Sequence, residues 1–439
     1  MSRIQIQDID QRSRSRSYRW LIFLILSGCY ILVNFHRLCP AVLAIDLMKD
    51  LEASGTLTGF LSSAYFYSYA IMQLPAGLLA DSWGPRKTIT LFFIIASLGS
   101  LILGMSSSVA LAITGRALVG LGVAMVFVPT MKILTKWFHV KEFAFMVSLF
   151  IAMGGVGTLT AATPLVWLNA LIGWRNAFLV VGAMTFALAL CVWFCVRNSP
   201  ADFGWPAPYK TMPEEVSPDR TLLKNAKIVL STLHFWPLAL WFFCNVGIFF
   251  AIGGLWGGPY LEHVYHLGKS ETGQILSTMA MGLVIGSPLF SILSDRVFHR
   301  RKAVMVISSA LVIVIMGIFS VFTDGLPLPI LYLLFFLFSV FSNSVVSIGF
   351  TLNKELFPVS ISGTATGLIN LFPFAGGAFF QPLVGHILES YGRTDGMFTL
   401  AGYKAVFHLL LAASGIAFTA SLFLKETMSG KLNKAAYPQ

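Results

Sequence analysis

The chain has 439 residues, of which 56% are hydrophobic and only 11% are charged, and its formal net charge is +11. Soluble domains carry about 25% charged residues, so this composition excludes a soluble globular protein and predicts a polytopic membrane protein. The first apolar run is long and lacks a small-residue cleavage site, so we expect no removable signal peptide. The five cysteines stand in apolar runs, and we expect no disulfide, metal or other cofactor.

A helix that crosses a bilayer needs about 20 apolar residues. We predict twelve of them, near 20–45, 57–79, 88–106, 109–133, 144–168, 176–196, 235–261, 273–293, 303–322, 329–352, 362–388 and 405–424. The longest loop is rich in proline and charge and divides the helices six and six. The predicted fold is an all-α membrane protein of two pseudo-symmetric six-helix bundles, with a basic tail at 1–19, the first bundle at 20–196, a linker at 197–234, the second bundle at 235–424 and a tail at 425–439.

The distribution of lysine and arginine predicts the orientation of the chain. Twelve helices place both termini on one side, and 22 Lys and Arg residues lie in the tails and loops of that side, against five in the opposite loops. The positive-inside rule then puts both termini and the linker in the cytoplasm. This asymmetry also explains the net charge without a nucleic-acid partner. The short outer loops favour a bacterial inner membrane.

Two segments in matching places of the two halves resemble one another. "GLLADSWGPRK" follows the second predicted helix, and "FSILSDRVFHRRK" follows the eighth. Each ends a helix with an aspartate and places an arginine five residues later, Asp81 with Arg86 and Asp295 with Arg300. A carboxylate in such a turn can pair with an arginine or lie at a neighbouring helix N-terminus. We predict two latches that gate the cytoplasmic side; the alternative is a basic loop that only sets topology.

Arg37 lies in the middle of an apolar run, on a helix face that it shares with Tyr30 and Asn34. Insertion scales put an arginine at the bilayer centre at about 2.5–3.5 kcal/mol unfavourable, so we expect it to face a water-filled cavity and to bind substrate. The alternatives are a structural ion pair and an arginine that extends to the outer surface. Against the ion pair, the nearest acids are Asp46 and Asp50, beyond the outer end of the same helix.

The fourth predicted helix carries Arg116 about two turns from its outer end, at a depth similar to that of Arg37. Two cations at one depth suggest an anionic substrate, although Arg116 can instead pack against backbone carbonyls at a helix end. We expect Lys132, near the inner end of this helix, to extend towards the surface. His36 is a candidate for proton coupling because histidine titrates near neutral pH; the alternative is a histidine that packs between helices.

Polar and aromatic residues recur at three-to-four spacing on several predicted helices. Each such stripe by itself is common in helix packing. Together, on matching helices of both halves, they predict a shared cavity with aromatic walls and a few polar groups. From these stripes we select Tyr69, Gln73, Trp256 and Asn343 as further substrate-binding residues.

The loop "GLLADSWGPRK" resembles the signature loop of the major facilitator superfamily. "GRALVGLGVAMVFVPTMKILTKWF" is similar to the arginine-and-glycine pattern of its fourth helix, and "GWRNAFLVVGA" to the start of its sixth. The resemblance covers nearly the whole chain. It implies twelve helices in two bundles, a central cavity and alternating access.

"FHRLCPAV" resembles the first-helix element of the superfamily's organic-anion branches, the anion–cation symporters and the organophosphate antiporters. There the arginine at the position of Arg37 binds the anionic group. Two positions depart from the symporters. His36 stands where they commonly have Asp, and Val123 where they commonly have Glu. Because those carboxylates are the family's candidates for proton coupling, the usual proton route is in doubt here.

The sequence as a whole predicts a secondary transporter, symporter or antiporter, of a small organic anion such as a carboxylate or phosphate ester, acting as a monomer. A proton or a counter-anion is the expected coupling partner. Amino acids or small peptides are the alternative substrates, because their carboxylate could use the same arginines. A membrane sensor on the same scaffold, which binds but does not transport, is the alternative from another class. No catalytic triad, zinc site or carboxylate pair indicates an enzyme.

Overall fold

The computed structural model describes residues 3–205 and 220–427. Within these ranges the chain is helical apart from one small antiparallel hairpin, in which β1 (Arg393–Thr394) pairs with β2 (Met397–Phe398). Ten helices of the described part are long and apolar enough to cross a membrane. The protein is therefore a multi-pass membrane protein, and the number of twelve crossings stays a prediction.

We use "N-terminal half" for α1 to α8 and "C-terminal half" for α10 to α19. The helices of the N-terminal half are α1 (Arg3–Leu38), α2 (Pro40–Asp50), α3 (Gly55–Ser82), α4 (Pro85–Gly104), α5 (Val109–Val123), α6 (Phe127–Trp137), α7 (Val140–Thr160) and α8 (Thr163–Cys195). A 3₁₀ turn (Pro200–Phe203) and α9 (Arg220–Ser231) belong to the connection between the halves.

The helices of the C-terminal half are α10 (Phe235–Trp241), α11 (Gly247–Ala251), α12 (Gly257–Val264), α13 (Lys269–Ile292), α14 (Arg301–Val321), α15 (Leu328–Ser339), α16 (Val346–Leu356), α17 (Val359–Ile369), α18 (Leu371–Ser390) and α19 (Leu400–Leu422). Single π-helical turns join several of them, namely η2 (Phe242–Val246), η3 (Ile252–Trp256), η4 (Leu293–Phe298) and η5 (Val340–Ser344). The seventh predicted span is thus one path from α10 to α12, and the tenth one path from α15 to α16.

Several predicted spans are interrupted where the sequence removes or weakens a helical hydrogen bond. The first span breaks at Cys39, between α1 and α2, because Pro40 has no N–H to donate to the preceding turn. The fourth span breaks between α5 and α6. The fifth and sixth spans meet inside α8 at Gly173, whose φ of 75° is a conformation that glycine adopts without strain.

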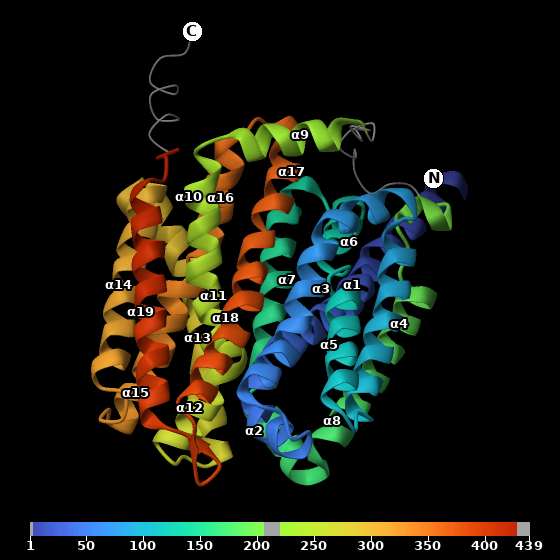
Figure 1. The fold of residues 1–439 in the computed structure, drawn as a ribbon. Helices are drawn as coiled ribbons and strands as arrows, with labels where there is room; N and C mark the ends of the chain where they lie inside the picture. The colour runs from blue at the N-terminus through green and yellow to red at the C-terminus, as the bar shows by residue number, and fades with distance from the viewer. Residues whose placement is uncertain (1–2, 206–219, 428–439) are drawn as a thin grey trace.

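The two halves stand side by side, with α9 across one end of the molecule (Figure 1). We call that end the linker end and the other the α2 end, after the helix that lies there (Figure 1). The halves meet most closely where α3 packs along α18. A Cβ built on Gly59 would lie 2.5 Å from the Cα of Pro382, so this approach requires a residue without a side chain.

Candidate functional site

Arg37, the second-last residue of α1, lies where the two halves meet. Its Nη1 donates a hydrogen bond to Asn34 Oδ1 at 3.3 Å. The guanidinium carbon lies 5.2 Å from the ring centroid of Tyr69 on α3, 5.1 Å from that of Phe374 on α18 and 6.0 Å from that of Phe250 on α11. One half therefore supplies the cation, and both halves supply the rings around it. We call Tyr69, Phe250 and Phe374 the ring box.

The charge of Arg37 has no protein counter-ion in the structure. It forms no ion pair with any residue whose side chain the structure describes, and its buried Nε has no hydrogen-bond partner there. Interaction with aromatic faces is the main compensation, at roughly 0.5–2 kcal/mol for each favourable contact. The described residues therefore do not show the structural ion pair that the sequence left open.

Arg116 on α5 has a different role in this structure. Its side chain is fully buried, and Nη1 donates a 2.8 Å hydrogen bond to the backbone carbonyl of His36. In an unbroken helix that carbonyl would accept from the N–H of residue 40, which is a proline here. Arg116 thus replaces the missing backbone donor at the end of α1. This is the alternative interpretation from the sequence, an arginine packed against a carbonyl at a helix end.

His36 is completely buried beside Arg37 in the sequence. Neither ring nitrogen has a hydrogen-bond partner among the described residues. A charged imidazolium is unfavourable in such a place without a partner. A role in proton coupling stays a prediction.

The other predicted binding residues lie in different surroundings. Tyr69 belongs to the ring box. Gln73, one turn further along α3, accepts a 2.8 Å hydrogen bond from Asn370 Nδ2 of the C-terminal half. Asn343 lies in η5 and is partly buried. Trp256 donates its indole N–H to the carbonyl of Gln381 at 2.8 Å, so this donor is already engaged in a contact between helices.

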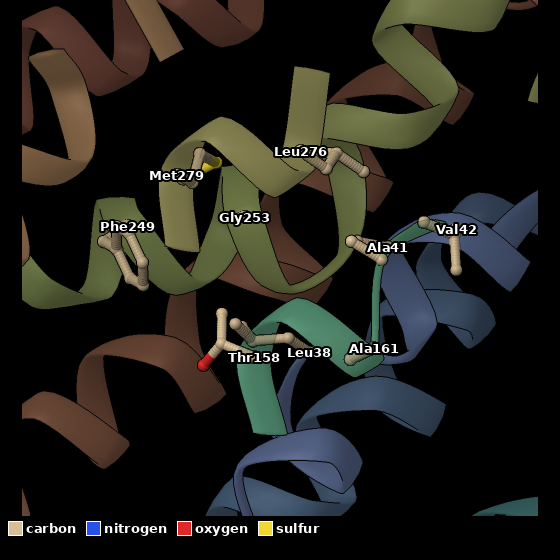
Figure 2. A pocket seen from close by; sticks show the side chains of 10 residues that line it. Leu38, Ala41, Val42, Thr158, Ala161, Phe249, Gly253, Leu276 and Met279 are labelled. Carbon is tan, nitrogen blue, oxygen red and sulfur yellow. The ribbon is translucent and has the colours of Figure 1, made fainter. Parts of the chain in front are cut away.

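A pocket opens between the halves and begins at Leu38, the residue after Arg37; its empty volume of about 290 Å³ includes space open to the surroundings. Figure 2 shows its lining residues around a common space; they come from α1, α2 and α7 with the turn after it in one half, and from α11, η3 and α13 in the other. The pocket is lined by Leu38, Ala41, Val42, Thr158, Ala161, Ala162, Phe249, Gly253, Leu276 and Met279. Thr158 supplies the one side-chain polar group, and its hydroxyl donates to the carbonyl of Gly154 at 3.3 Å.

The first predicted latch has a different pairing from the one the sequence suggested. Asp81 forms its ion pair with Lys132 of α6, at 2.6 Å, rather than with Arg86. Arg86 instead donates from Nε to the carbonyl of Trp193 at 2.9 Å, and its guanidinium stacks over the ring of Trp193. Sequence spacing placed the two charges in one loop, but in the fold Asp81 contacts α6 and Arg86 contacts α8.

In the second latch the side chain of Asp295 lies outside the described part of the structure, and Arg300 is exposed. The neighbouring Arg301, which sequence reasoning passed over, is buried. Its Nε lies 3.6 Å from Glu355 Oε2 of α16, and its Nη1 donates to Ser294 Oγ at 2.9 Å. Because "HRRK" contains three cations in a row, the sequence alone did not indicate which of them is buried.

The helices that follow the two latch loops have their first amides capped in a similar way. The amide of Arg86, near the start of α4, donates to Asn198 Oδ1 at 2.9 Å. The amides of Arg301 and Lys302, at the start of α14, donate to the two oxygens of Glu426 at 3.0 and 3.1 Å. Asn198 follows α8 and Glu426 follows α19. In each half, a side chain just beyond the last helix therefore caps the helix that follows the latch loop of that half.

At the α2 end, charged contacts run between the halves. Lys269 Nζ of α13 lies 2.5 Å from Asp46 Oδ1, and Asn169 donates to Asp46 Oδ2 at 2.7 Å. Glu389 of α18 accepts a 2.6 Å hydrogen bond from the amide of Gly55, at the start of α3. These contacts could not be expected from the sequence, because a pairing between helix ends that lie far apart in the chain has no local sequence pattern.

Asp50 lies at the same end but is paired within the N-terminal half. Its carboxylate accepts a 2.9 Å hydrogen bond from the indole N–H of Trp174 and lies 2.7 Å from Arg175 Nη1. The hydrogen bond from Trp174, followed by those from Arg175, holds the pKa of the Asp50 carboxyl below its ordinary value. The turn at Gly173 brings both partners to α2.

The sequence was compared with those of known proteins and matches a known family. The model of the Major Facilitator Superfamily matches residues 22–267 and 252–439. The chain is 23% identical to a probable sulfoacetate transporter of Cupriavidus necator, covering 94% of this chain and 95% of that protein. It is 23% identical to a probable galactarate/D-glucarate transporter of Escherichia coli (92% and 93% covered) and 24% identical to a probable hexose phosphate transport protein of Chlamydia trachomatis (87% of each).

Solved structures agree on the fold. A bacterial homolog to the human lysosomal transporter Spinster, solved inward-facing and unoccupied, superposes with a TM-score of 0.74 at 18% identity, over 93% of this chain and 98% of that one. A nucleoside transporter superposes with a TM-score of 0.75 at 14% identity, over 93% and 100%. These relatives are transporters, which confirms the expectation that the chain is not an enzyme. The chain belongs to the Major Facilitator Superfamily, as its loop and helix motifs predicted, and it has that superfamily's fold.

Proposed function

We propose that this protein is a secondary active transporter that moves a small organic anion by alternating access, with Arg37 as the group that binds the anionic charge. The observation that carries the proposal is a guanidinium at the junction of the two halves that forms no ion pair with any side chain in the described part of the chain. A carboxylate or phosphate can accept two parallel N–H bonds from such a group.

The position of Arg37 also suggests how binding is linked to movement. The ring box takes Tyr69 from the N-terminal half and two rings from the C-terminal half. An anion that draws the guanidinium away from these rings changes contacts on both sides of the interface. Ligands shift a conformational equilibrium only through such differential contacts.

The names of the relatives support an anionic substrate. Sulfoacetate, galactarate, glucarate and hexose phosphate are all anions. Amino acids or small peptides remain the alternative substrates, since they carry a carboxylate too. In both cases Arg116 acts indirectly, by holding the end of α1 on which Arg37 stands.

We further propose that the linker end faces the cytoplasm of a bacterial cell, across its inner membrane, and that Asp81, Arg86, Asp295 and Arg300 belong to the gating loops there. The charge asymmetry of the loops supports this orientation. Charged contacts between the halves lie at the α2 end, whereas Asp81 pairs within its own half. This pattern favours an inward-facing state.

The test is ligand-induced thermal stabilisation of the purified protein, screened with carboxylates, sugar phosphates, amino acids and dipeptides. A ligand at 100 times its Kd adds about 2.7 kcal/mol to the stability of the folded state. We expect an anionic class to raise the Tm of the wild type, Arg37→Gln to lose that shift and Arg37→Lys to retain part of it. Lys132→Gln is the matched control, since it removes a cation of the same half that already has a partner.

Two outcomes contradict the proposal. If Arg37→Gln responds to the anion as the wild type does, Arg37 does not bind the substrate. If the anion binds but proteoliposomes loaded with it show no counterflow, the protein is a sensor on a transporter scaffold rather than a transporter.

A further inference from the structure

We infer that the anion taken by this site has a compact apolar body, as in aromatic or branched-alkyl acids, rather than a chain of hydroxyl groups. The inference rests on the proposed function and makes its substrate class more specific. It departs from the sugar acids named for the Escherichia coli relative, because it depends on what surrounds Arg37 in this chain.

The first argument is the continuity of aromatic surface around the guanidinium. The centroids of Tyr69 and Phe374 lie 4.2 Å apart, and Phe250 lies 4.8 Å from Phe66 and 6.0 Å from Phe374. Phe66 and Tyr69 come from α3, and Phe250 and Phe374 from the other half. An acid bound to Arg37 therefore has ring faces beside it, which attract flat or branched apolar groups.

The second argument is the character of the neighbouring pocket. It begins at Leu38, immediately after Arg37, and alanine, leucine, valine, phenylalanine and methionine side chains make up most of its lining (Figure 2). The hydroxyl of Thr158 already donates to a backbone carbonyl. A substrate hydroxyl placed here finds few groups that can replace its bonds to water.

The third argument is that several polar side chains near Arg37 are already engaged, although both ring nitrogens of His36 have no hydrogen-bond partner among the described residues. Asn34 donates to the carbonyl of Tyr30 and accepts from Arg37. Tyr65 donates its hydroxyl to the carbonyl of Val33 at 3.2 Å. Gln73 accepts from Asn370 across the interface, which leaves its buried Nε2 as a donor without a partner among the described residues. A polyhydroxylated acid needs several free partners, and each hydroxyl left without one lowers its affinity.

The same surroundings disfavour a zwitterion. The ring box, the pocket lining and the engaged amides contain no carboxylate that could accept a substrate ammonium group. Removing an amino group from a substrate of unchanged body should therefore strengthen binding. This separates the proposed class from the amino acids that the site could otherwise accept through their carboxylate.

The experiment compares three compounds by thermal-shift titration of the full-length protein: 3-phenylpropanoate, phenylalanine and gluconate. The first two share a body and differ in the ammonium group; gluconate carries the same charge as 3-phenylpropanoate but is polyhydroxylated. We expect 3-phenylpropanoate to bind at least about tenfold more tightly than either, because neither hydroxyls nor an ammonium find partners. Phe374→Leu should weaken 3-phenylpropanoate about fivefold more than it weakens gluconate. Phe319→Leu, which removes a buried ring that stacks on Phe407 elsewhere in the C-terminal half, should leave both unchanged.

Arg37→Gln separates this inference from the proposed function. If gluconate or phenylalanine binds as tightly as 3-phenylpropanoate, and Arg37→Gln abolishes that binding, the inference is wrong and the proposed function stands. If Phe374→Leu weakens gluconate and 3-phenylpropanoate equally, the rings do not select the body and the inference is also wrong. If no acid binds, or if Arg37→Gln binds them unchanged, the proposed function fails and this inference fails with it.

Discussion

Each half of the molecule contains an ion pair beside its latch loop. In the N-terminal half, Asp81 at the end of α3 pairs with Lys132 of α6. In the C-terminal half, Arg301 at the start of α14 pairs with Glu355 of α16. Both pairs lie at the corresponding loops of the repeat, but not at corresponding positions, because Asp81 stands at the end of the helix before its loop and Arg301 begins the helix after the other loop. The side chains of Lys132 and Asp81 are 27% and 70% exposed, whereas those of Arg301 and Glu355 are 11% and 12% exposed.

This difference shows how a repeated architecture can serve two purposes. An exposed ion pair is weak and readily exchanged, since water and salt screen it. A buried pair is hard to break because either partner alone would be an uncompensated charge in a medium of low polarity. We therefore interpret the Asp81–Lys132 pair as the one that can open and the Arg301–Glu355 pair as a fixed part of its half.

The largest effect should come from Glu355→Gln. Leaving Arg301 buried beside a neutral amide should cost roughly 3–5 kcal/mol, the range for breaking a buried pair. Thermal unfolding of the purified variant would show this as a lower Tm. Glu355→Asp, which keeps the charge, should recover part of the loss. A Tm for Glu355→Gln equal to that of the wild type would contradict the difference we draw between the two pairs.

We expect a smaller loss of stability for Arg116→Met. Arg116 belongs to the N-terminal half, and the corresponding segment of the other half, residues 328–353, contains no Lys or Arg. Removing the donor to the carbonyl of His36 should cost about 1.5–3 kcal/mol, as for a hydrogen bond from a charged group. Pro40→Ala restores a backbone N–H that can reach this carbonyl. Arg116→Met should therefore destabilise the Pro40→Ala background less than the wild type, and equal losses in both backgrounds would refute the role.

Glu426→Gln tests the helix-capping hydrogen bonds, which occur in a similar place in each half. Its carboxylate accepts from two amides at the start of α14, where a negative charge is favoured by about 0.3–1 kcal/mol. We expect a small decrease in Tm. Asn198→Asp, at the corresponding place in the N-terminal half, should give a small increase for the same reason. Changes of the same sign in both variants would show that the two caps are not equivalent.

The smallest effect on stability is expected for Asp81→Asn, at roughly 0.2–1 kcal/mol, because the lost pair is exposed. The difference from the wild type should disappear in 1 M salt, where the Debye length is about 3 Å. Thermal unfolding at low and high salt measures both statements. A loss that persists in high salt would mean that Asp81 is structural in the same way as Glu355.

Local features of the chain were enough to predict the fold class. The apolar runs, the charge asymmetry and the repeated loop are properties of neighbouring residues, and the predicted spans fall on helical parts of the structure, although several of them cross a break between two helices. The polar face of Tyr30, Asn34 and Arg37 could be predicted for the same reason, since helical spacing alone decides which residues share a face.

The tertiary contact partners of the charged and polar groups could not be predicted in this way. The sequence determined that a cation stands in the first span; only the packing of α3 and α18 decided that rings from both halves surround it. The sequence likewise placed Asp81 and Arg86 in one loop, while tertiary contacts assigned them to Lys132 and Trp193. It showed a proline at position 40, but only the approach of α5 supplied the donor that the proline lacks. Helices form from bonds within a few residues, whereas charges and buried carbonyls take whichever partner the fold brings near.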